Sequence, residues 1–151
     1  MALQVGDKAP DIKTTEFSLA SLKGQRAVVF FFPKADTPGC TKEACEFRDA
    51  SRTFNKKKAA IIGISPDKPA AHAKFAAKYG LPFTLVADPD HAIAEAYGVW
   101  KEKSMYGRKY MGIERSAFLI DEKGKIARAW YKVSPKDTPA VLLDALAAAP
   151  T

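Results

Sequence analysis

Cys40 and Cys45 are the two cysteines of this 151-residue chain, and their type and spacing make them its best candidates for chemistry. Thr37 and Pro38 precede Cys40 in a pattern typical of a helix start, with Thr37 as N-cap and Pro38 as the first helical residue. The unpaired N–H groups and the dipole at such a position favour the thiolate form of Cys40. The sequence therefore predicts a nucleophilic thiolate, although a free cysteine can also be simply a small apolar residue on the buried face of a helix.

The spacing of the two cysteines predicts motion between two redox forms. On an ideal helix Cys45 lies about 140° around the axis from Cys40, and the two Cα atoms are about 8.6 Å apart. A disulfide rarely tolerates more than roughly 7 Å between Cα atoms, so the pair can bond only if the first turns of the helix unwind. This arrangement suits a two-step cycle in which Cys40 is oxidised to a sulfenic acid and Cys45 then resolves it as a disulfide.

The elements that must position these cysteines follow from hydrophobic patterning. The apolar run 27–32 predicts a buried central strand that ends at Pro33, and apolar or small residues recurring from Cys40 to Phe54 predict one amphipathic helix. Residues 1–26 are predicted to be a loop-rich segment that covers the domain. The remaining pattern predicts a strand at 59–64, a helix from 65 to 79 ended by Gly80, a strand at 83–86, a short helix at 88–97, a hairpin of strands 116–121 and 125–131, and a last helix that begins at Thr138-Pro139.

This order of elements predicts an α/β protein with a thioredoxin-like fold, in which a mixed central β-sheet is flanked by helices on both faces. The composition, 47% hydrophobic and 27% charged, is typical of one compact soluble domain. The first residues do not have the pattern of a signal peptide, and the longest apolar run is too short to cross a membrane. We therefore expect a cytoplasmic protein without a membrane partner.

Two separated motifs resemble one family. The pattern Pro33-(x)3-Thr37-(x)2-Cys40 is similar to the active-site motif of the peroxiredoxins. Both the residues that follow it, 41–45, and the segment 106–116 resemble the bacterioferritin comigratory protein branch, also called the Q type. The resemblance extends over essentially the whole chain and implies a single peroxiredoxin domain at 1–151.

The resemblance implies a role for each matching residue. Cys40 would be the peroxidatic cysteine and Cys45 the resolving cysteine, while Thr37, Pro33 and Arg115 would complete the peroxide site. Glu43 would belong to the surroundings of that site. Without the resemblance, Thr37 is a plain helix cap, Pro33 ends a strand, Glu43 is a first-turn acid that complements the helix dipole, and Arg115 is one of 24 basic residues with a solvated side chain.

The implied activity is that of a thiol-dependent peroxidase that reduces hydrogen peroxide and organic hydroperoxides. The Cys40 sulfenic acid would be resolved by Cys45 as an intramolecular disulfide, and thioredoxin would then reduce this disulfide. The resemblance also implies a monomer, and neither a cofactor nor a metal is expected. The chain departs from the common pattern of the branch at two positions, with Phe32 in place of a tyrosine and Ala117 in place of a threonine.

Three other functions compete with that of a peroxidase. A general thiol–disulfide exchanger or redox sensor stays open as the alternative, although its usual motif is C-x-x-C. Cys40, Cys45, His72 and His91 could supply metal ligands, but their spacing is unlike that of zinc sites, and both histidines are predicted to be solvated surface residues without the partners of a hydrolase. The net charge is +7, and its basic residues include Lys56-Lys57-Lys58 and the cluster 101–109. These residues are scattered over several elements, and no helix that could read a nucleic-acid groove is predicted among them, so no nucleic-acid partner is expected.

Overall fold

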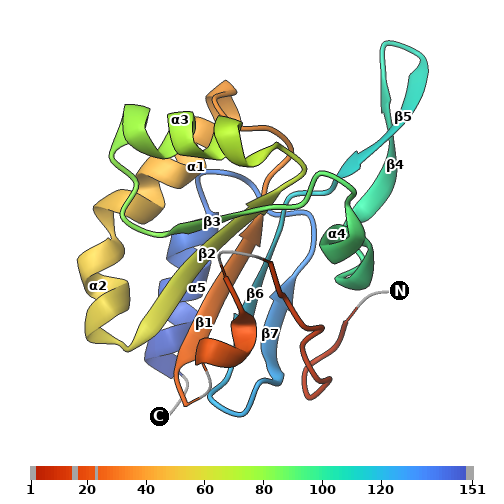
Figure 1. The fold of residues 1–151 in the computed structure, drawn as a ribbon. Helices are drawn as coiled ribbons and strands as arrows, with labels where there is room; N and C mark the ends of the chain where they lie inside the picture. The colour runs from red at the N-terminus through yellow and green to blue at the C-terminus, as the bar shows by residue number, and fades with distance from the viewer. Residues whose placement is uncertain (1–2, 15–16, 23, 149–151) are drawn as a thin grey trace.

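The computed structural model describes residues 3–14, 17–22 and 24–148 (Figure 1). Its centre is a five-stranded sheet in the order β3-β2-β1-β6-β7. The first three strands of this order run parallel, and β6 and β7 each pair antiparallel with their neighbours, so the predicted mixed sheet and thioredoxin-like layout are confirmed. The sheet strands are β1 (Arg26–Phe31), β2 (Ala59–Ser65), β3 (Thr84–Ala87), β6 (Ser116–Ile120) and β7 (Ile126–Trp130).

The central strand β1 is apolar throughout because both of its faces are buried. Val28 and Phe30 point into one core cluster, and Val29 and Phe31 into the other, as the alternation of side chains along a strand requires. Such a strand appears in sequence as one unbroken apolar run, which is why its position was predictable. Its carboxyl end leads directly to the helix that carries both cysteines.

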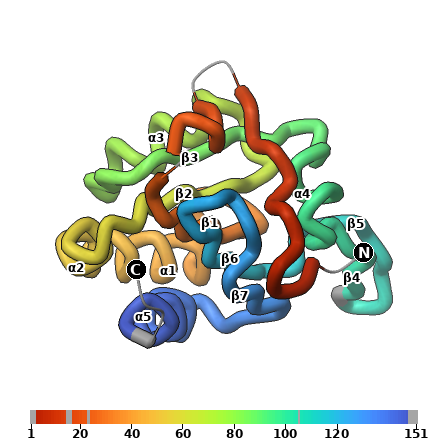
Figure 2. The backbone as a smooth tube through the Cα atoms, turned by 90° about the horizontal axis from the view of Figure 1, so that it is seen from below, coloured from red at the N-terminus to blue at the C-terminus, as the bar shows by residue number. Residues whose placement is uncertain are grey.

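Helices cover both faces of the sheet, as predicted, but unequally (Figure 2). The helices with residues in the first core cluster are α1 (Pro38–Asp49), α2 (Ser51–Lys56), α3 (Pro69–Tyr79) and α5 (Thr138–Ala148). The second cluster is closed by the short helix α4 (Ala92–Ala96), by the N-terminal segment and by the 3-10 turn Leu19–Leu22. No helix in the described ranges is long and apolar enough to cross a membrane.

Aromatic packing fixes α1 on the sheet. The ring of Phe47 stacks on that of Phe30, with centroids 4.4 Å apart and planes 16° from parallel. Both side chains are fully buried, and burial of one phenylalanine stabilises a fold by about 1.5–3 kcal/mol. This contact anchors the carboxyl-terminal part of α1, seven residues after Cys40, on the central strand.

The predicted single helix through Cys40 and Phe54 is in fact two helices, which corrects the prediction. Ala50, with φ −93° and ψ 1°, ends α1 and precedes α2. Phe47 and Phe54 still share the first core cluster, so the apolar pattern was interpreted correctly. Neither glycine nor proline marks the break, and the sequence therefore offered no signal for it.

Two other helices begin later than predicted because side chains organise the turns before them. Ser65 is the last residue of β2, and its hydroxyl donates to the Asp67 carboxylate, so α3 begins at Pro69 and not at Ser65. Before α4, His91 adopts a left-handed conformation with φ 52°. The Asp88 carboxylate accepts the backbone N–H groups of Ile93 and Ala94, which caps α4 from upstream.

A two-stranded hairpin, β4 (Trp100–Met105) and β5 (Arg108–Ile113), was missed by the sequence analysis. It projects from the body of the protein (Figure 1). Tyr106 and Gly107 form its turn with φ 51° and 78°, the left-handed geometry of a tight hairpin. A tyrosine is unusual at the first of these positions, where asparagine or aspartate is the common signal, so the turn was not recognised.

Candidate active site

Cys40 lies in the first turn of α1, where the sequence placed it. Thr37 is the N-cap in an extended conformation, and Pro38 is the first helical residue. The Cys40 side chain is only 2% exposed and packs in the first core cluster with Ala44 and Phe47. Cys40 therefore combines the two possibilities that the sequence left open, a helix amino end and a buried face.

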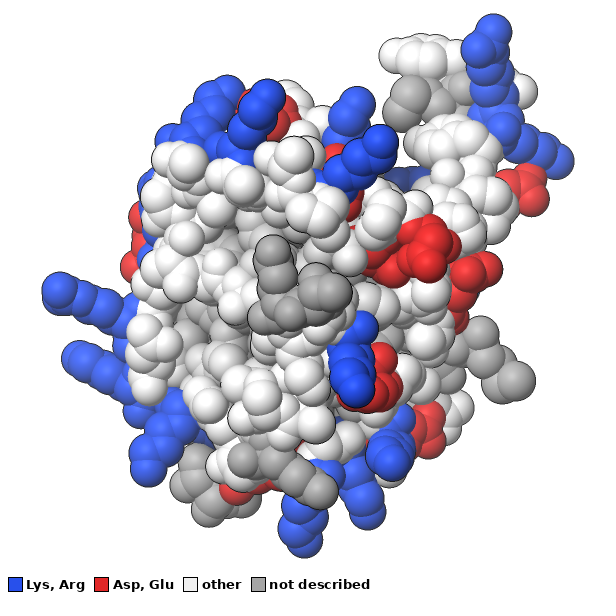
Figure 3. Space-filling model, viewed as in Figure 1, with Lys and Arg blue, Asp and Glu red and all other residues white. Residues whose placement is uncertain are grey.

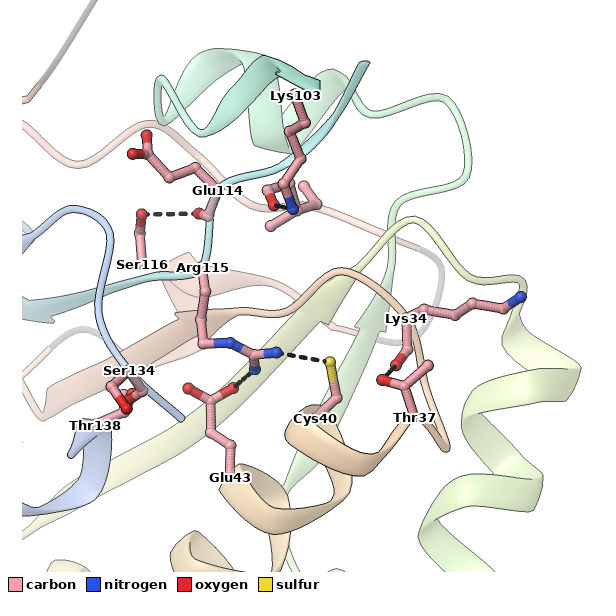
Figure 4. Close-up of polar contacts among 11 residues, drawn as sticks. Lys34, Thr37, Cys40, Glu43, Lys103, Glu114, Arg115, Ser116, Ser134 and Thr138 are labelled. Carbon is pink, nitrogen blue, oxygen red and sulfur yellow. Dashed lines mark hydrogen bonds and ion pairs between the residues drawn. The ribbon is translucent and has the colours of Figure 1, made fainter. Parts of the chain in front are cut away.

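The hydroxyl of Thr37 does not cap the helix, although its residue is the N-cap. Its Oγ1 donates to the carbonyl of Lys34 at 2.8 Å, and the backbone carbonyl of Thr37 accepts the N–H of Thr41. Figure 4 shows this hydroxyl at the same end of the helix as the Cys40 sulfur. Because the hydrogen of the hydroxyl is occupied, its oxygen is left as an acceptor toward the site.

Arg115 contacts the Cys40 thiol directly (Figure 4). Its Nη2 lies 3.1 Å from Cys40 Sγ, and its Nη1 donates to Glu43 Oε1 at 2.6 Å. Arg115 stands in the link between β5 and β6, where its backbone carbonyl accepts the N–H of Val133. The interpretation of Arg115 as a solvated surface cation is therefore wrong, because its side chain is 14% exposed and occupied by two partners.

Gly39 leaves room for the guanidinium group. A Cβ at this position would lie 3.4 Å from Arg115 Nη2 and 3.5 Å from Pro135. Any larger side chain would extend from this point into the space that Arg115 occupies. The absence of a side chain thus permits Arg115 to reach the cysteine that follows Gly39.

Glu43 is fully buried beneath Arg115, in the second turn of α1, so its description as a first-turn acid was wrong. Burial raises the pKa of its carboxyl group to about 7, against the opposing effect of the Arg115 charge. Glu43 Oε2 has no hydrogen-bond donor among the described residues, because the Thr138 hydroxyl donates instead to the carbonyl of Ser134. The carboxyl group is therefore poised to change its protonation state near neutral pH.

Replacement of Glu43 with glutamine should change how stability depends on pH. The folded wild type retains the Glu43 proton up to a pKa of about 7, whereas the unfolded chain releases it near 4.5. The folded state thus binds more protons in this window, and stability falls as pH rises through it. Urea unfolding between pH 4 and pH 8 should show wild type losing about 3 kcal/mol relative to Glu43→Gln. Parallel pH profiles of the two proteins would contradict this.

Two cations, Arg115 and Lys103, interact electrostatically with Cys40. Burial acts to lower the pKa of Arg115, but Glu43 and Cys40 together raise it, so its guanidinium stays charged. Lys103, from β4, donates from Nζ to the carbonyl of Ile113 at 2.7 Å (Figure 4). Burial and the charge of Arg115 lower the pKa of Lys103, whereas the charge of Cys40 raises it. Lys103 was missed as a neighbour of the site because the hairpin that carries it was not predicted.

Cys45 lies further along the same helix and is half-buried. Neither cysteine is in a disulfide. The helix is continuous from Pro38 to Asp49, so the helical geometry that separates the two Cα atoms applies to this form of the protein.

The loop that connects β1 to α1 carries Pro33, which is half-buried. The Ala35 N–H donates to Asp67 Oδ2 at 2.7 Å, and Asp36 accepts hydrogen bonds from both Lys78 and Tyr79. Asp36 has a left-handed φ of 62° and is held in it by these contacts with α3. The loop is thus attached at two consecutive residues before the helix begins.

His72 is buried and is part of the support of this loop, so its description as a solvated residue was wrong. It is 5% exposed, and its Nε2 lies 2.6 Å from Ser65 Oγ. Since the Ser65 hydroxyl donates to Asp67, the histidine ring is the donor to Ser65. Desolvation by burial lowers the pKa of His72, which favours this neutral form.

The second histidine has a different environment. His91 is half-buried and stacks on Trp100, with ring centroids 4.0 Å apart. Across the described residues, no three His, Cys, Asp or Glu side chains come together as metal ligands. His72 and His91 thus belong to separate structural contacts.

Both departures from the family pattern lie in the core around Cys40. Phe32 is 1% exposed, and its ring packs against those of Phe30, His72 and Phe75. Ala117 is fully buried in β6, opposite Phe30 in β1. The chain therefore has apolar contacts at these two positions, where relatives often have hydroxyl groups.

Cys40 is a buried thiol at the amino end of a helix, and Arg115 lies within hydrogen-bond distance of its sulfur. On a thioredoxin-like fold, this arrangement is suited to the chemistry of a reactive thiolate. Residues 5–129 match the model of the AhpC/TSA family, and the chain belongs to this family. It is a peroxiredoxin and hence a thiol-dependent peroxidase.

The chain is similar to named members of the family. It is 46% identical to Peroxiredoxin Bcp of Bacillus subtilis, over 97% of this chain and 96% of that protein, and 46% identical to Peroxiredoxin Bcp of Escherichia coli K12, over 82% and 83%. The structure of Xanthomonas campestris Peroxiredoxin Q superposes with a TM-score of 0.83 at 42% identity, over 87% of this chain and 84% of that one.

Proposed function

We propose that Cys40 is the peroxidatic cysteine of this peroxidase, and that Arg115, Thr37 and Pro33 complete its peroxide site. The observation that carries this proposal is the contact between Arg115 Nη2 and Cys40 Sγ at 3.1 Å. The Cys40 thiolate attacks one oxygen of the peroxide, the O–O bond breaks, and the sulfur becomes a sulfenic acid. The departing hydroxide or alkoxide takes up a proton and leaves as water or an alcohol.

Each neighbour contributes through its position. The charged guanidinium of Arg115 stabilises both the thiolate and the charge that develops on the leaving oxygen. The Thr37 oxygen accepts a hydrogen bond from the incoming peroxide, and Pro33 shields the sulfur from water. Glu43 acts through Arg115, because its carboxyl group orients the guanidinium from below.

Cys45 resolves the sulfenic acid. Its thiolate attacks the Cys40 sulfur, a disulfide forms, and the sulfenic oxygen leaves as water. The two cysteines are too far apart for this on the intact α1, so the step requires the first turns of the helix to unwind. The ends of helices are among the least costly parts of a protein to open.

The wider setting of the reaction follows from the same resemblance. The substrates are hydrogen peroxide and organic hydroperoxides, and the reductant is thioredoxin. Alkyl peroxide reduction is the activity studied in the Xanthomonas campestris bacterioferritin comigratory protein, which is 41% identical to this chain. The chain acts in the cytoplasm as a monomeric single domain at 1–151, and without a nucleic-acid partner.

The role of Cys45 can be tested with Cys45→Ser. This variant should form one Cys40 sulfenic acid per chain in a single turnover, but it should stall with thioredoxin or accumulate overoxidised Cys40. The assay is NADPH oxidation coupled through thioredoxin and thioredoxin reductase, together with mass spectrometry of Cys40. Full turnover by Cys45→Ser would show that another thiol resolves the sulfenic acid.

The same assay separates a peroxidase from a general thiol–disulfide exchanger. NADPH oxidation by wild type should depend on added peroxide and saturate with it. An exchanger would instead reduce a disulfide substrate, such as insulin, in the absence of peroxide. Equal rates with and without peroxide would favour the exchanger.

A further inference from the structure

The hairpin β4–β5 carries most of the large hydrophobic side chains that are exposed among the described residues. Among the described residues the exposed large hydrophobic side chains are Val5, Tyr106, Tyr110 and Met111, and the last three belong to this hairpin. It projects away from the sheet (Figure 1), and basic side chains lie along it (Figure 3). Exposed aromatic residues combined with arginine are typical of protein interfaces.

The two faces of the hairpin differ in charge. Lys103 pairs with Tyr110 across the strands and Lys101 with Gly112, so these residues share one face with Arg108. We define the basic hairpin face by Lys101, Lys103, Arg108 and Tyr110. The opposite face carries Glu102, Lys109 and Met111, and there the lysine is 3.7 Å from the glutamate. Positive charge is therefore unbalanced on the basic hairpin face only.

The basic hairpin face continues into the active site. Lys103 reaches the base of the hairpin, where its Nζ donates to the carbonyl of Ile113, two residues before Arg115 (Figure 4). A Cβ at Gly112 would lie 3.1 Å from Lys103 Cδ and 3.4 Å from the ring of Tyr110, so both side chains pack over this glycine. Their positions are thus set before any partner arrives, which lowers the entropic cost of binding.

We propose that the basic hairpin face is the docking surface for the protein that reduces the Cys40–Cys45 disulfide, and that this partner has an acidic surface beside its reactive dithiol. The inference rests on the proposed function, because it presupposes that disulfide. A protein held on this face would contact β5, which ends two residues before Arg115, and Arg115 contacts Cys40. Opposite charges on the two surfaces steer such an encounter and set its orientation.

Two double variants test the proposal with the same change in net charge. Arg108→Glu/Tyr110→Ser alters the basic hairpin face, and Lys109→Glu/Met111→Ser alters the opposite face at the adjacent positions. Thioredoxin serves as the reductant, and dithiothreitol, which needs no docking surface, serves as the reference. The first variant should raise the KM for thioredoxin about tenfold, and the second less than about twofold. Turnover with dithiothreitol and the rate constant for peroxide should be unchanged in both.

Salt dependence and sedimentation complete the test. The KM of wild type for thioredoxin should rise with ionic strength, and that of the first variant should rise less. Equal effects of the two variants, or no effect of either, would overturn the proposal. A wild-type dimer that only the first variant dissociates, with unchanged thioredoxin kinetics, would assign the face to a second copy and also overturn it. Absence of peroxide reduction by wild type with dithiothreitol would instead contradict the proposed function, on which the inference depends.

Discussion

Cys40→Ser should lose peroxide reduction by about 1,000-fold or more. A serine hydroxyl ionises far less readily than a thiol, and Arg115, which lies within hydrogen-bond distance of this position, is a charged donor that cannot serve as its general base. The measurement is the second-order rate of hydrogen peroxide consumption by the reduced protein. The position is buried, and serine is close to cysteine in size, so the fold should be retained.

Cys45→Ser provides the matched control for this prediction. It makes the same chemical change in the same helix, but it leaves the first turn of α1 unaltered. It should consume one equivalent of peroxide at a rate close to that of wild type. Comparable single-turnover rates for Cys40→Ser and wild type would show that Cys40 is not the nucleophile.

Arg115→Ala should reduce the rate with peroxide by about 100-fold or more. The change removes the guanidinium that lies 3.1 Å from the Cys40 sulfur, and it leaves Glu43 buried without its cation. Two effects then combine: the thiolate form of Cys40 is less populated, and the leaving oxygen is less stabilised. Iodoacetamide alkylation against pH measures the first effect, and the peroxide rate at a pH where the thiol is fully ionised measures the second.

Arg115→Lys separates charge from geometry. A lysine retains a positive charge but lacks the two-pronged donor that reaches the sulfur and the Glu43 carboxylate together. It should recover part of the thiolate population and little of the peroxide rate. An alkylation profile that is identical in wild type and Arg115→Ala would contradict the role of Arg115.

Local signals explain which parts of the structure were predictable. The strand before the site, the helix start at Thr37-Pro38 and the position of Cys40 all depend on residues close together in sequence, and the structure confirms them. The Arg115–Cys40 contact joins positions 75 residues apart, so only the family resemblance could point to Arg115. The family motif pointed to Arg115, but the hydrogen bond between Arg115 and the Cys40 sulfur could be seen only in the folded structure.

The errors have physical reasons of the same kind. The break at Ala50 has no glycine or proline to mark it, and the turn of the β4–β5 hairpin has a tyrosine in a conformation that usually takes asparagine or glycine. The burial of His72 depends on Ser65 at the end of a neighbouring strand. For His72 a contact between two elements decides the structure, and the pattern of the residues around it does not report that contact.

The attachment of the loop at Ala35 and Asp36 has a consequence for the catalytic cycle. Asp67 holds the first of these residues and α3 holds the second, so the chain just before Thr37 stays pinned if the helix after it opens as proposed. In the proposed cycle the pinned loop would be the pivot of the segment that opens. We then expect only a short stretch to gain conformational entropy when the disulfide forms, and to rewind from a fixed start after reduction, which favours a rapid return to the peroxide-reactive form.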